Sequence, residues 1–311
     1  AATFANTVAA YEKSGELLNQ VSTVFGNLLS AETNDDMQEL AKSIMPLLSE
    51  HGNNITLNEK LFARIKAVYD QKDQANLTPE QNKLLEKVYN SFVRSGANLE
   101  GEAKEQYRAL SKELSLLTLQ FGENNLKETN DYKLVLTDPA QLAGLPQSAI
   151  DAAAETAKEK GVEGWVFTLQ APSYSPFMTY ASNRDLRCKL YMAYNTKCTH
   201  DNETNNLEIV KKLVNTRLAI AQLLGYSSFA EYNLQERMAE NSGNVYKLLD
   251  QLLDAYTPTA KQEYAEVEAL ARQLEGSDFT VMPWDWSYYS HKLKDQKFQI
   301  DDEMLRPYFE L

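Results

Sequence analysis

Apolar residues recur every three or four positions through most of this chain, which is the spacing of one face of an α-helix. Two helix starts are marked by capping signals, Thr56-Leu57-Asn58-Glu59 and Thr78-Pro79-Glu80-Gln81. The apolar faces predicted behind them are Leu61, Phe62, Ile65, Val68 and Tyr69, then Leu84, Leu85, Val88, Tyr89 and Phe92. The pattern therefore predicts two amphipathic helices packed on a common core.

The same spacing predicts further helices over residues 5–29, 34–50, 101–124, 147–160, 183–195, 204–224, 228–239 and 244–275. We expect Pro46 to tighten the end of the second of these helices and Pro258 to kink the last. Strands are predicted only at 132–136 and 164–169, where β-branched and aromatic residues are flanked by Gly and Pro. The predicted fold is mainly α, a multi-helix lobe with one small inserted β-hairpin or sheet.

This pattern divides the chain into three predicted regions. Residues 1–130 form an N-terminal helical region, residues 131–170 a small α/β insertion, and residues 171–311 a second helical region. Gly and Pro together make up 21 of 311 residues, which agrees with long uninterrupted helices. The formal net charge is −13 and no basic stripe stands out, so the sequence argues against nucleic acid or an anionic membrane as a partner.

Catalytic motifs are missing from the sequence as written. The three histidines, His51, His200 and His291, are far apart, none opens an HExxH motif, and polar neighbours make solvent exposure the simplest expectation. No glycine-rich phosphate loop, GxSxG elbow or CxxC pair occurs, and with 44 acidic residues no carboxylate pair is distinctive. From the residues alone we expect no catalytic and no metal-ligating residue in this chain.

Two observations bear on the cellular compartment. Cys188 and Cys198 flank a predicted helix at a separation of roughly 15 Å, which is too far for a disulfide, so reduced thiols are expected. Reduced thiols favour a reducing compartment. No signal peptide or membrane span is visible, and we expect a cytoplasmic location, with a periplasmic one left open.

Eight phrases in order resemble the N-terminal half of the thimet-oligopeptidase and peptidyl-dipeptidase family of zinc metallopeptidases, best its bacterial dipeptidyl carboxypeptidase branch. The resemblance runs from near Tyr11 to the last residue. Its strongest phrases are Pro172-Ser173-Tyr174-Ser175-Pro176, Asn183-Arg184-Asp185-Leu186-Arg187, Leu223-Leu224-Gly225-Tyr226, Pro283-Trp284-Asp285-Trp286 and Leu305-Arg306-Pro307-Tyr308-Phe309. Gly122 and Asn125 depart from the family pattern near Phe121.

The resemblance implies that the parent protein is a peptidase with two helical lobes facing a narrow channel. Zinc, held by an HExxH helix and a further Glu, polarises a water in that channel, and short peptides are the substrates. In the family this zinc site follows the segment that resembles 301–309. The chain is therefore expected to be an N-terminal lobe that is inactive alone and whose partner is its own C-terminal catalytic domain.

Five residues in these phrases are candidates for lining the substrate channel: Tyr174, Arg184, Arg187, Trp284 and Tyr288. Arg184 and Arg187 lie at a predicted helix start, where positive charge is unfavourable. A contact with substrate or the opposite lobe would explain them, and so would a salt bridge to a neighbour such as Asp185 or an exposed position. Tyr174 is expected in a rigid loop, where core packing is the competing explanation. The alternative to a peptidase lobe is a non-catalytic helical binding or scaffold protein.

Overall fold

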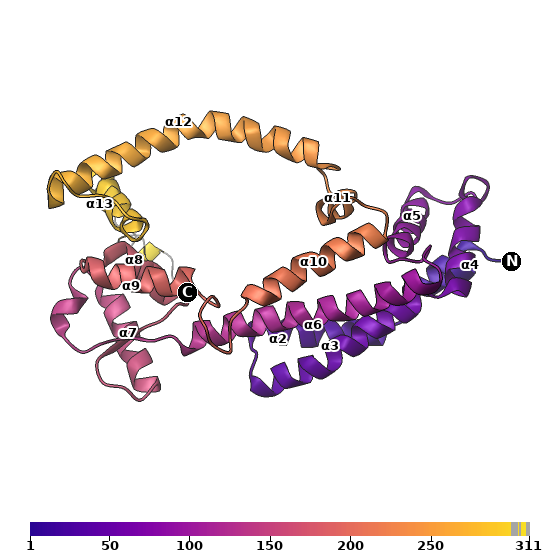
Figure 1. The fold of residues 1–311 in the computed structure, drawn as a ribbon, viewed down its shortest axis with the longest axis horizontal. Coiled ribbons are helices and arrows are strands. Elements are labelled where there is room, and N and C mark those ends of the chain that lie inside the picture. Colours follow the sequence, from indigo (N-terminus) through magenta and orange to yellow (C-terminus); the bar gives the residue numbers. More distant parts are fainter. Residues whose placement is uncertain (300–303, 305, 309–311) are drawn as a thin grey trace. The chain divides into compact units, whose positions relative to one another are not determined.

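The computed structural model describes residues 1–299, 304 and 306–308, so most of the segment 301–309 lies outside the described residues. Helices dominate, and one two-stranded sheet accompanies them, which confirms the predicted fold class (Figure 1). No helix of the described part is both long and apolar enough to cross a membrane. The chain divides into two compact units, each built from two separate segments of sequence.

Unit 1 comprises residues 1–123 and 207–242. It contains a π-helical opening turn, η1, the helices that follow it, a 3₁₀ turn, η2, and the first part of α6. Their bounds are η1 Phe4–Ala9, α1 Ala10–Lys13, α2 Glu16–Ala31, α3 Asp35–Thr56, α4 Glu59–Asp70, η2 Lys72–Gln74, α5 Pro79–Arg94, α6 Gly101–Asp131, α10 Leu207–Leu223 and α11 Phe229–Leu234.

The core between α4 and α5 is the one that the apolar periodicity predicts. Phe62, Ile65 and Val68 of α4 and Leu85, Val88 and Phe92 of α5 are buried together. The Phe62 ring stacks on Phe92, with ring centroids 6.2 Å apart, so aromatic packing joins the two helices. The predicted capping box at Thr78 is present, with Pro79 in the first turn of α5.

Two predictions about helix ends in unit 1 are wrong. Asn58, not Thr56, caps α4, and its side chain accepts a hydrogen bond from the Leu61 amide, since asparagine is at least as good an N-cap as threonine. Thr56 ends α3 instead and donates to the Gly52 carbonyl. Pro46 lies inside α3, which continues ten residues further, because a proline removes only one backbone donor from an otherwise intact helix.

Unit 2 comprises residues 124–206 and 243–311, of which the structure describes the parts given above. Its elements are the last part of α6, two strands, further helices and three 3₁₀ turns. Their bounds are β1 Leu134–Leu136, η3 Pro139–Leu142, α7 Gln147–Glu159, β2 Trp165–Phe167, α8 Ala171–Tyr180, α9 Arg184–Asn195, α12 Ser242–Glu275, η4 Pro283–Asp285, α13 Trp286–Phe298 and η5 Arg306–Tyr308.

The sheet of unit 2 is antiparallel, with Leu134 opposite Phe167 and Leu136 opposite Trp165. Its two strands are joined through η3 and α7 rather than by a tight turn. One face of the sheet carries Leu134, Leu136 and Phe167 into a core shared with α8 and α9, where Phe167 meets Phe177 edge to face at 4.7 Å. This core fixes the position of α9, whose first turn carries two of the candidate residues.

Candidate functional site

The first turn of α9 lies against η4 within unit 2. Asn183 caps α9 by accepting a hydrogen bond from the Leu186 amide, and this places Arg184 and Arg187 in the first helical turn. Asp285, the last residue of η4, is fully buried between them. A turn that is separated from α9 by about a hundred residues of sequence therefore supplies the counter-charge for both arginines.

Each oxygen of the Asp285 carboxylate accepts hydrogen bonds from this cluster. Oδ1 accepts from Arg187 Nη2 at 2.8 Å and from Arg184 Nε at 3.1 Å. Oδ2 accepts from Arg184 Nη2 at 2.7 Å and from the Met282 amide at 3.0 Å. We call Arg184, Arg187 and Asp285 the arginine–aspartate cluster. A carboxylate held in this way is compensated although it has no contact with solvent.

Each of the three guanidinium nitrogens of Arg187 donates a hydrogen bond to a group inside the protein. Its side chain is 1% exposed, and besides Asp285 it donates to the carbonyl oxygens of Ala181, Ser182 and Trp284. The Tyr288 ring covers the guanidinium, with its centroid 4.1 Å from Cζ. The ion pair expected as one explanation for Arg187 is thus present, but with Asp285 rather than with Asp185.

Arg184 is the more accessible of the two arginines. Its side chain is 40% exposed, lies over the Phe279 ring at 4.4 Å and donates to the Thr280 carbonyl. Trp284 is half-buried beside Tyr191, and its indole N–H has no hydrogen-bond partner within the described part of the chain. Arg184, Arg187, Trp284 and Tyr288 therefore come together in one place.

Tyr174 lies elsewhere in unit 2, and the prediction of a rigid loop there is wrong. It belongs to α8, because Pro172 occupies the first turn, where a missing N–H costs nothing, and Pro176 is tolerated within the helix. The half-buried Tyr174 ring stacks on Tyr194 with centroids 4.4 Å apart and packs against the core of the sheet. Burial, the main effect, raises the pKa of the Tyr174 hydroxyl.

The sequence analysis did not identify Asp285 as the ion-pair partner of Arg184 and Arg187, although Asp285 belongs to one of the motif phrases, Pro283-Trp284-Asp285-Trp286. A carboxylate two residues after a proline at a helix start is itself a capping signal, and Asp285 does accept a hydrogen bond from the Met282 amide.

The sequence analysis also missed an apolar pocket of about 540 Å³ on the neighbouring surface, lined by Ala260, Tyr264, Val281, Met282, Pro283 and Trp286. There the Tyr264 and Trp286 rings lie parallel, with centroids 5.7 Å apart.

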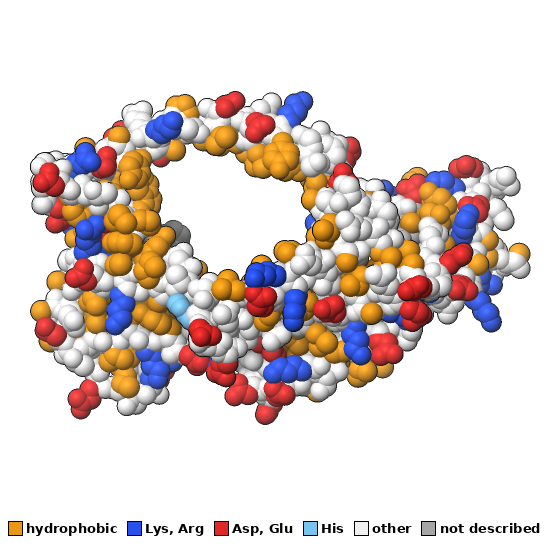
Figure 2. Space-filling model, viewed as in Figure 1, with side chains coloured by type: hydrophobic (Ala, Val, Ile, Leu, Met, Phe, Trp, Pro, Cys, Tyr) orange, Lys and Arg blue, Asp and Glu red, His pale blue; other side chains and the backbone are white. Residues whose placement is uncertain are grey.

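This pocket continues a row of exposed apolar residues on α12. Tyr246, Leu249, Leu253 and Tyr256 recur at intervals of three and four residues and are each at least half exposed. Figure 2 shows hydrophobic side chains gathered over α12 and beside α13. We call these four residues the α12 apolar row. Exposed apolar surface of this extent on one helix is typical of a surface that binds another protein segment.

Of the three histidines, His200 lies near another potential ligand, with its Nε2 3.6 Å from Glu128 Oε1. His51 and His200 are exposed, whereas His291 is half-buried with its ring against Tyr180, so the expectation of solvent exposure is wrong for His291. Among residues 1–299, 304 and 306–308, no three His, Cys, Asp or Glu side chains lie close enough to hold a metal ion. The donor groups present in the described residues therefore do not fit a catalytic zinc.

Both cysteines are free thiols, as the sequence predicts. Cys198 is buried just beyond the end of α9, and burial, reinforced by the Glu128 carboxylate, raises the pKa of its thiol to about 11. The same Glu128 carboxylate accepts hydrogen bonds from the Cys198 amide at 2.7 Å and the Thr204 hydroxyl at 2.9 Å. The thiol stays protonated at neutral pH and is better described as packing than as a nucleophile.

The arginine–aspartate cluster predicts a specific dependence of stability on pH. Burial by itself would raise the pKa of Asp285, but hydrogen bonds from Arg184, Met282 and Arg187 hold it below its usual value. The unfolded chain, with a carboxyl pKa of about 3.9, binds this proton more readily. The cluster therefore makes its full contribution to the free energy of unfolding above about pH 4. This contribution falls as the pH drops through the lower pKa that Asp285 has in the folded state. Urea unfolding curves between about pH 6 and pH 2 should show a shallower decline for Asp285→Asn than for the parent chain.

Comparisons with known proteins find similarity to one family of peptidases. The model of "Peptidase family M3" matches residues 177–311. The chain is 34% identical to the dipeptidyl carboxypeptidase of Escherichia coli over 309 residues, which cover 99% of the chain and 45% of that relative. It is 32% identical to oligopeptidase A of Haemophilus influenzae, covering 99% of the chain and 46% of that relative.

A more distant relative is saccharolysin of Saccharomyces cerevisiae, 26% identical over 96% of the chain. The chain spans less than half the length of each of these curated relatives. Over nearly its whole length the chain is thus a homologue of the peptidase family M3 proteins dipeptidyl carboxypeptidase and oligopeptidase A.

Proposed function

We propose that the chain is the N-terminal, channel-wall lobe of a zinc-dependent peptidase that hydrolyses short peptides and releases C-terminal dipeptides. The observation that carries this proposal is the continuous likeness to dipeptidyl carboxypeptidase, which covers 99% of the chain but only 45% of the relative. In this proposal the zinc ligands and the general base are supplied by sequence outside the present chain. No step of hydrolysis is assigned to its residues.

The α12 apolar row and the adjoining pocket support a lobe that docks onto further polypeptide. Tyr256 is 66% exposed and Leu253 64%, so burying the rest of each large side chain in this row would gain roughly 1–2 kcal/mol. We propose that the catalytic part of the parent covers this surface. The three-region division at 1–130, 131–170 and 171–311 is retained in the proposal, with the third region leading into that part.

The five candidate channel residues divide into two roles in this proposal. Arg184, whose side chain is 40% exposed, and the half-buried Trp284 are the members of the cluster that keep exposed surface for a peptide. Arg187 and Tyr288 hold the wall behind them, since both are buried. Tyr174 is proposed as a separate aromatic contact on α8, stacked on Tyr194.

The proposal is tested by comparing this chain with the longer polypeptide encoded by the same gene, both supplied with zinc and a short N-blocked peptide. We expect the longer protein to release a C-terminal dipeptide and this chain to release nothing, with the products identified by mass spectrometry. Stoichiometric zinc binding and hydrolysis by residues 1–311 alone would contradict the assignment.

A non-catalytic helical binding or scaffold protein is the second candidate function, and the exposed α12 apolar row is the observation that favours it. The two candidates differ in the reading frame after Leu311. An in-frame HExxH motif supports the peptidase lobe, whereas an immediate stop codon supports the binding protein.

A further inference from the structure

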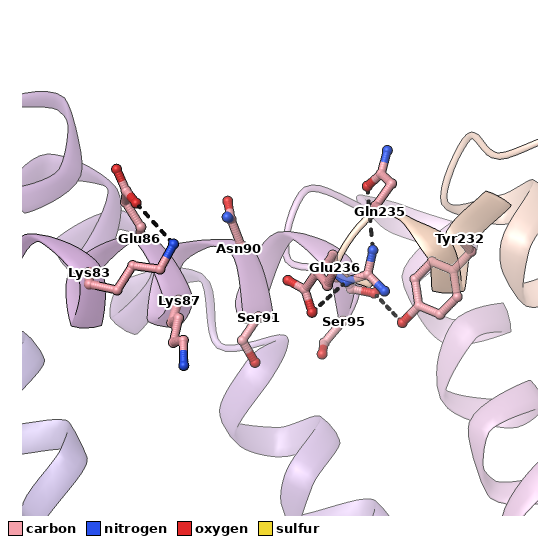
Figure 3. A pocket seen from close by; sticks show the side chains of 10 residues that line it. Lys83, Glu86, Lys87, Asn90, Ser91, Ser95, Tyr232, Gln235 and Glu236 are labelled. Carbon is pink, nitrogen blue, oxygen red and sulfur yellow. Dashed lines mark hydrogen bonds and ion pairs between the residues drawn. The ribbon is translucent and has the colours of Figure 1, made fainter. Parts of the chain in front are cut away.

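Unit 1 contains a polar pocket of about 820 Å³ between α5 and the segment 232–236 (Figure 3). The proposed function assigns no role to it. Most of its lining consists of charged, amide or hydroxyl side chains rather than apolar ones. A recess with this lining is suited to a polar ligand that carries charges of its own.

One end of the pocket is cationic. Lys87 on α5 is exposed and has no ion pair or hydrogen bond within the described part of the chain, while Lys83, one turn earlier, pairs only loosely with Glu86 at 3.8 Å. Figure 3 shows the side chains of Lys87 and Ser91 extending from the same side of α5, as their i, i+4 spacing requires. An ammonium next to a hydroxyl is a suitable site for a carboxylate.

The other end of the pocket is built around Arg94. Its side chain is 13% exposed and lies 4.3 Å over the Tyr232 ring, and it donates to Gln235 at 3.4 Å and pairs with Glu236 Oε2 at 3.4 Å. The Glu236 side chain remains 54% exposed, so its carboxylate keeps surface that a ligand can reach. The acceptors at this end are held in place by a side chain that is already anchored.

The two ends are separated by a distance that suits a short peptide. Lys87 and Arg94 are seven residues apart on one helix, which corresponds to roughly 10 Å along its axis. An extended tripeptide spans about the same length. From this separation, the ammonium of Lys87, which is unpaired among the described residues, and the half-exposed carboxylate of Glu236, we infer that the pocket binds a short peptide with free termini. The carboxylate lies at Lys87 and Ser91, the amino group lies at Glu236, and Asn90 contacts the peptide backbone.

This site goes beyond the proposed function, because it lies in unit 1, contains none of the five channel candidates and requires no zinc or hydrolysis. It also differs from a general anion site, since a bare anion has no group for Glu236 to accept from. Trialanine with free termini is a suitable probe, because its methyl side chains leave recognition to its two ends.

The test is isothermal titration calorimetry of residues 1–311 with trialanine. We expect saturable one-to-one binding, weakened about tenfold by C-terminal amidation and similarly by N-acetylation. Lys87→Gln and Glu236→Gln should each weaken binding of the free peptide by about the same factor. Lys87→Gln should bind the free and the amidated peptide equally well, and Glu236→Gln should bind the free and the N-acetylated peptide equally well. This is the result that a double-mutant cycle requires if each residue contacts the terminus assigned to it.

Matched controls are Lys112→Gln and Glu113→Gln, which remove exposed charges on α6 outside the pocket and should leave the affinity unchanged. Equal binding of free and amidated peptide would overturn the inference, as would the absence of binding at millimolar peptide. Inorganic phosphate that competes with trialanine as strongly as trialanine itself would show a general anion site and would also overturn it.

Discussion

The Asp285→Asn variant is expected to lower the free energy of unfolding of unit 2 by about 3–5 kcal/mol, the usual cost of breaking a buried ion pair. Asparagine keeps the size of the side chain but leaves the Arg187 guanidinium, which is 1% exposed, without a counter-charge. Its amide group also turns a donor toward other donors, since both carboxylate oxygens of Asp285 are acceptors in the native structure.

Tryptophan fluorescence during urea unfolding measures this effect in the appropriate unit, because Trp165, Trp284 and Trp286 all lie in unit 2. The matched control is Asp278→Asn, an exposed aspartate near the same turn, for which we expect a change within about 0.5 kcal/mol. Equal free energies of unfolding for the two variants would contradict the prediction that the arginine–aspartate cluster contributes strongly to the packing of α9 against η4.

A second large effect is expected for Gly164→Ala, which should destabilise unit 2 by about 3 kcal/mol or more. Gly164 precedes β2 with φ at +92°, a backbone conformation that side chains other than glycine rarely adopt. A Cβ atom at this position would lie 2.1 Å from the Leu136 carbonyl oxygen of β1. Because that neighbour is backbone in the partner strand, relief requires the strands to separate.

Gly161→Ala provides the matched control for this variant. Gly161 lies two residues after the end of α7 with φ at +65°, but a Cβ there would meet no atom within 4 Å. Only the left-handed conformation is then penalised, at about 1 kcal/mol. Tryptophan fluorescence during urea unfolding separates the two costs, and equal losses of stability in the two variants would rule out the clash with β1.

The helical architecture was largely predictable because it depends on local pattern. Amphipathic spacing predicted α4 and α5, and the Thr78 capping box with Pro79 located the start of α5. The failures occurred where local signals compete: Pro46 and Pro176 both lie within helices that their neighbours sustain. Propensity alone does not decide such cases, since packing of the rest of the helix outweighs one missing hydrogen bond.

Less of the candidate site was predictable. The motif phrases brought Arg184, Arg187, Trp284 and Tyr288 into view, but not the carboxylate that joins the two arginines. Asp285 lies 98 positions after Arg187, and the chain contains 44 acidic residues with nothing in their spacing to single one out. The apolar pocket beside Trp286 was missed for the same reason, because Tyr264 and Trp286 belong to different helices.

Apolar periodicity, capping residues and turn residues act over a few positions, so the sequence by itself determined a mainly helical protein with one small sheet. The ordered motif phrases likewise indicated its resemblance to peptidase family M3 proteins, which the comparisons confirm. Only the tertiary structure decided which aspartate neutralises Arg187, which aromatic rings meet, and which apolar row on α12 stays uncovered. Contacts between distant segments depend on how whole helices and strands pack. The sequence position of a charged or aromatic residue therefore does not reveal which distant residue it will contact.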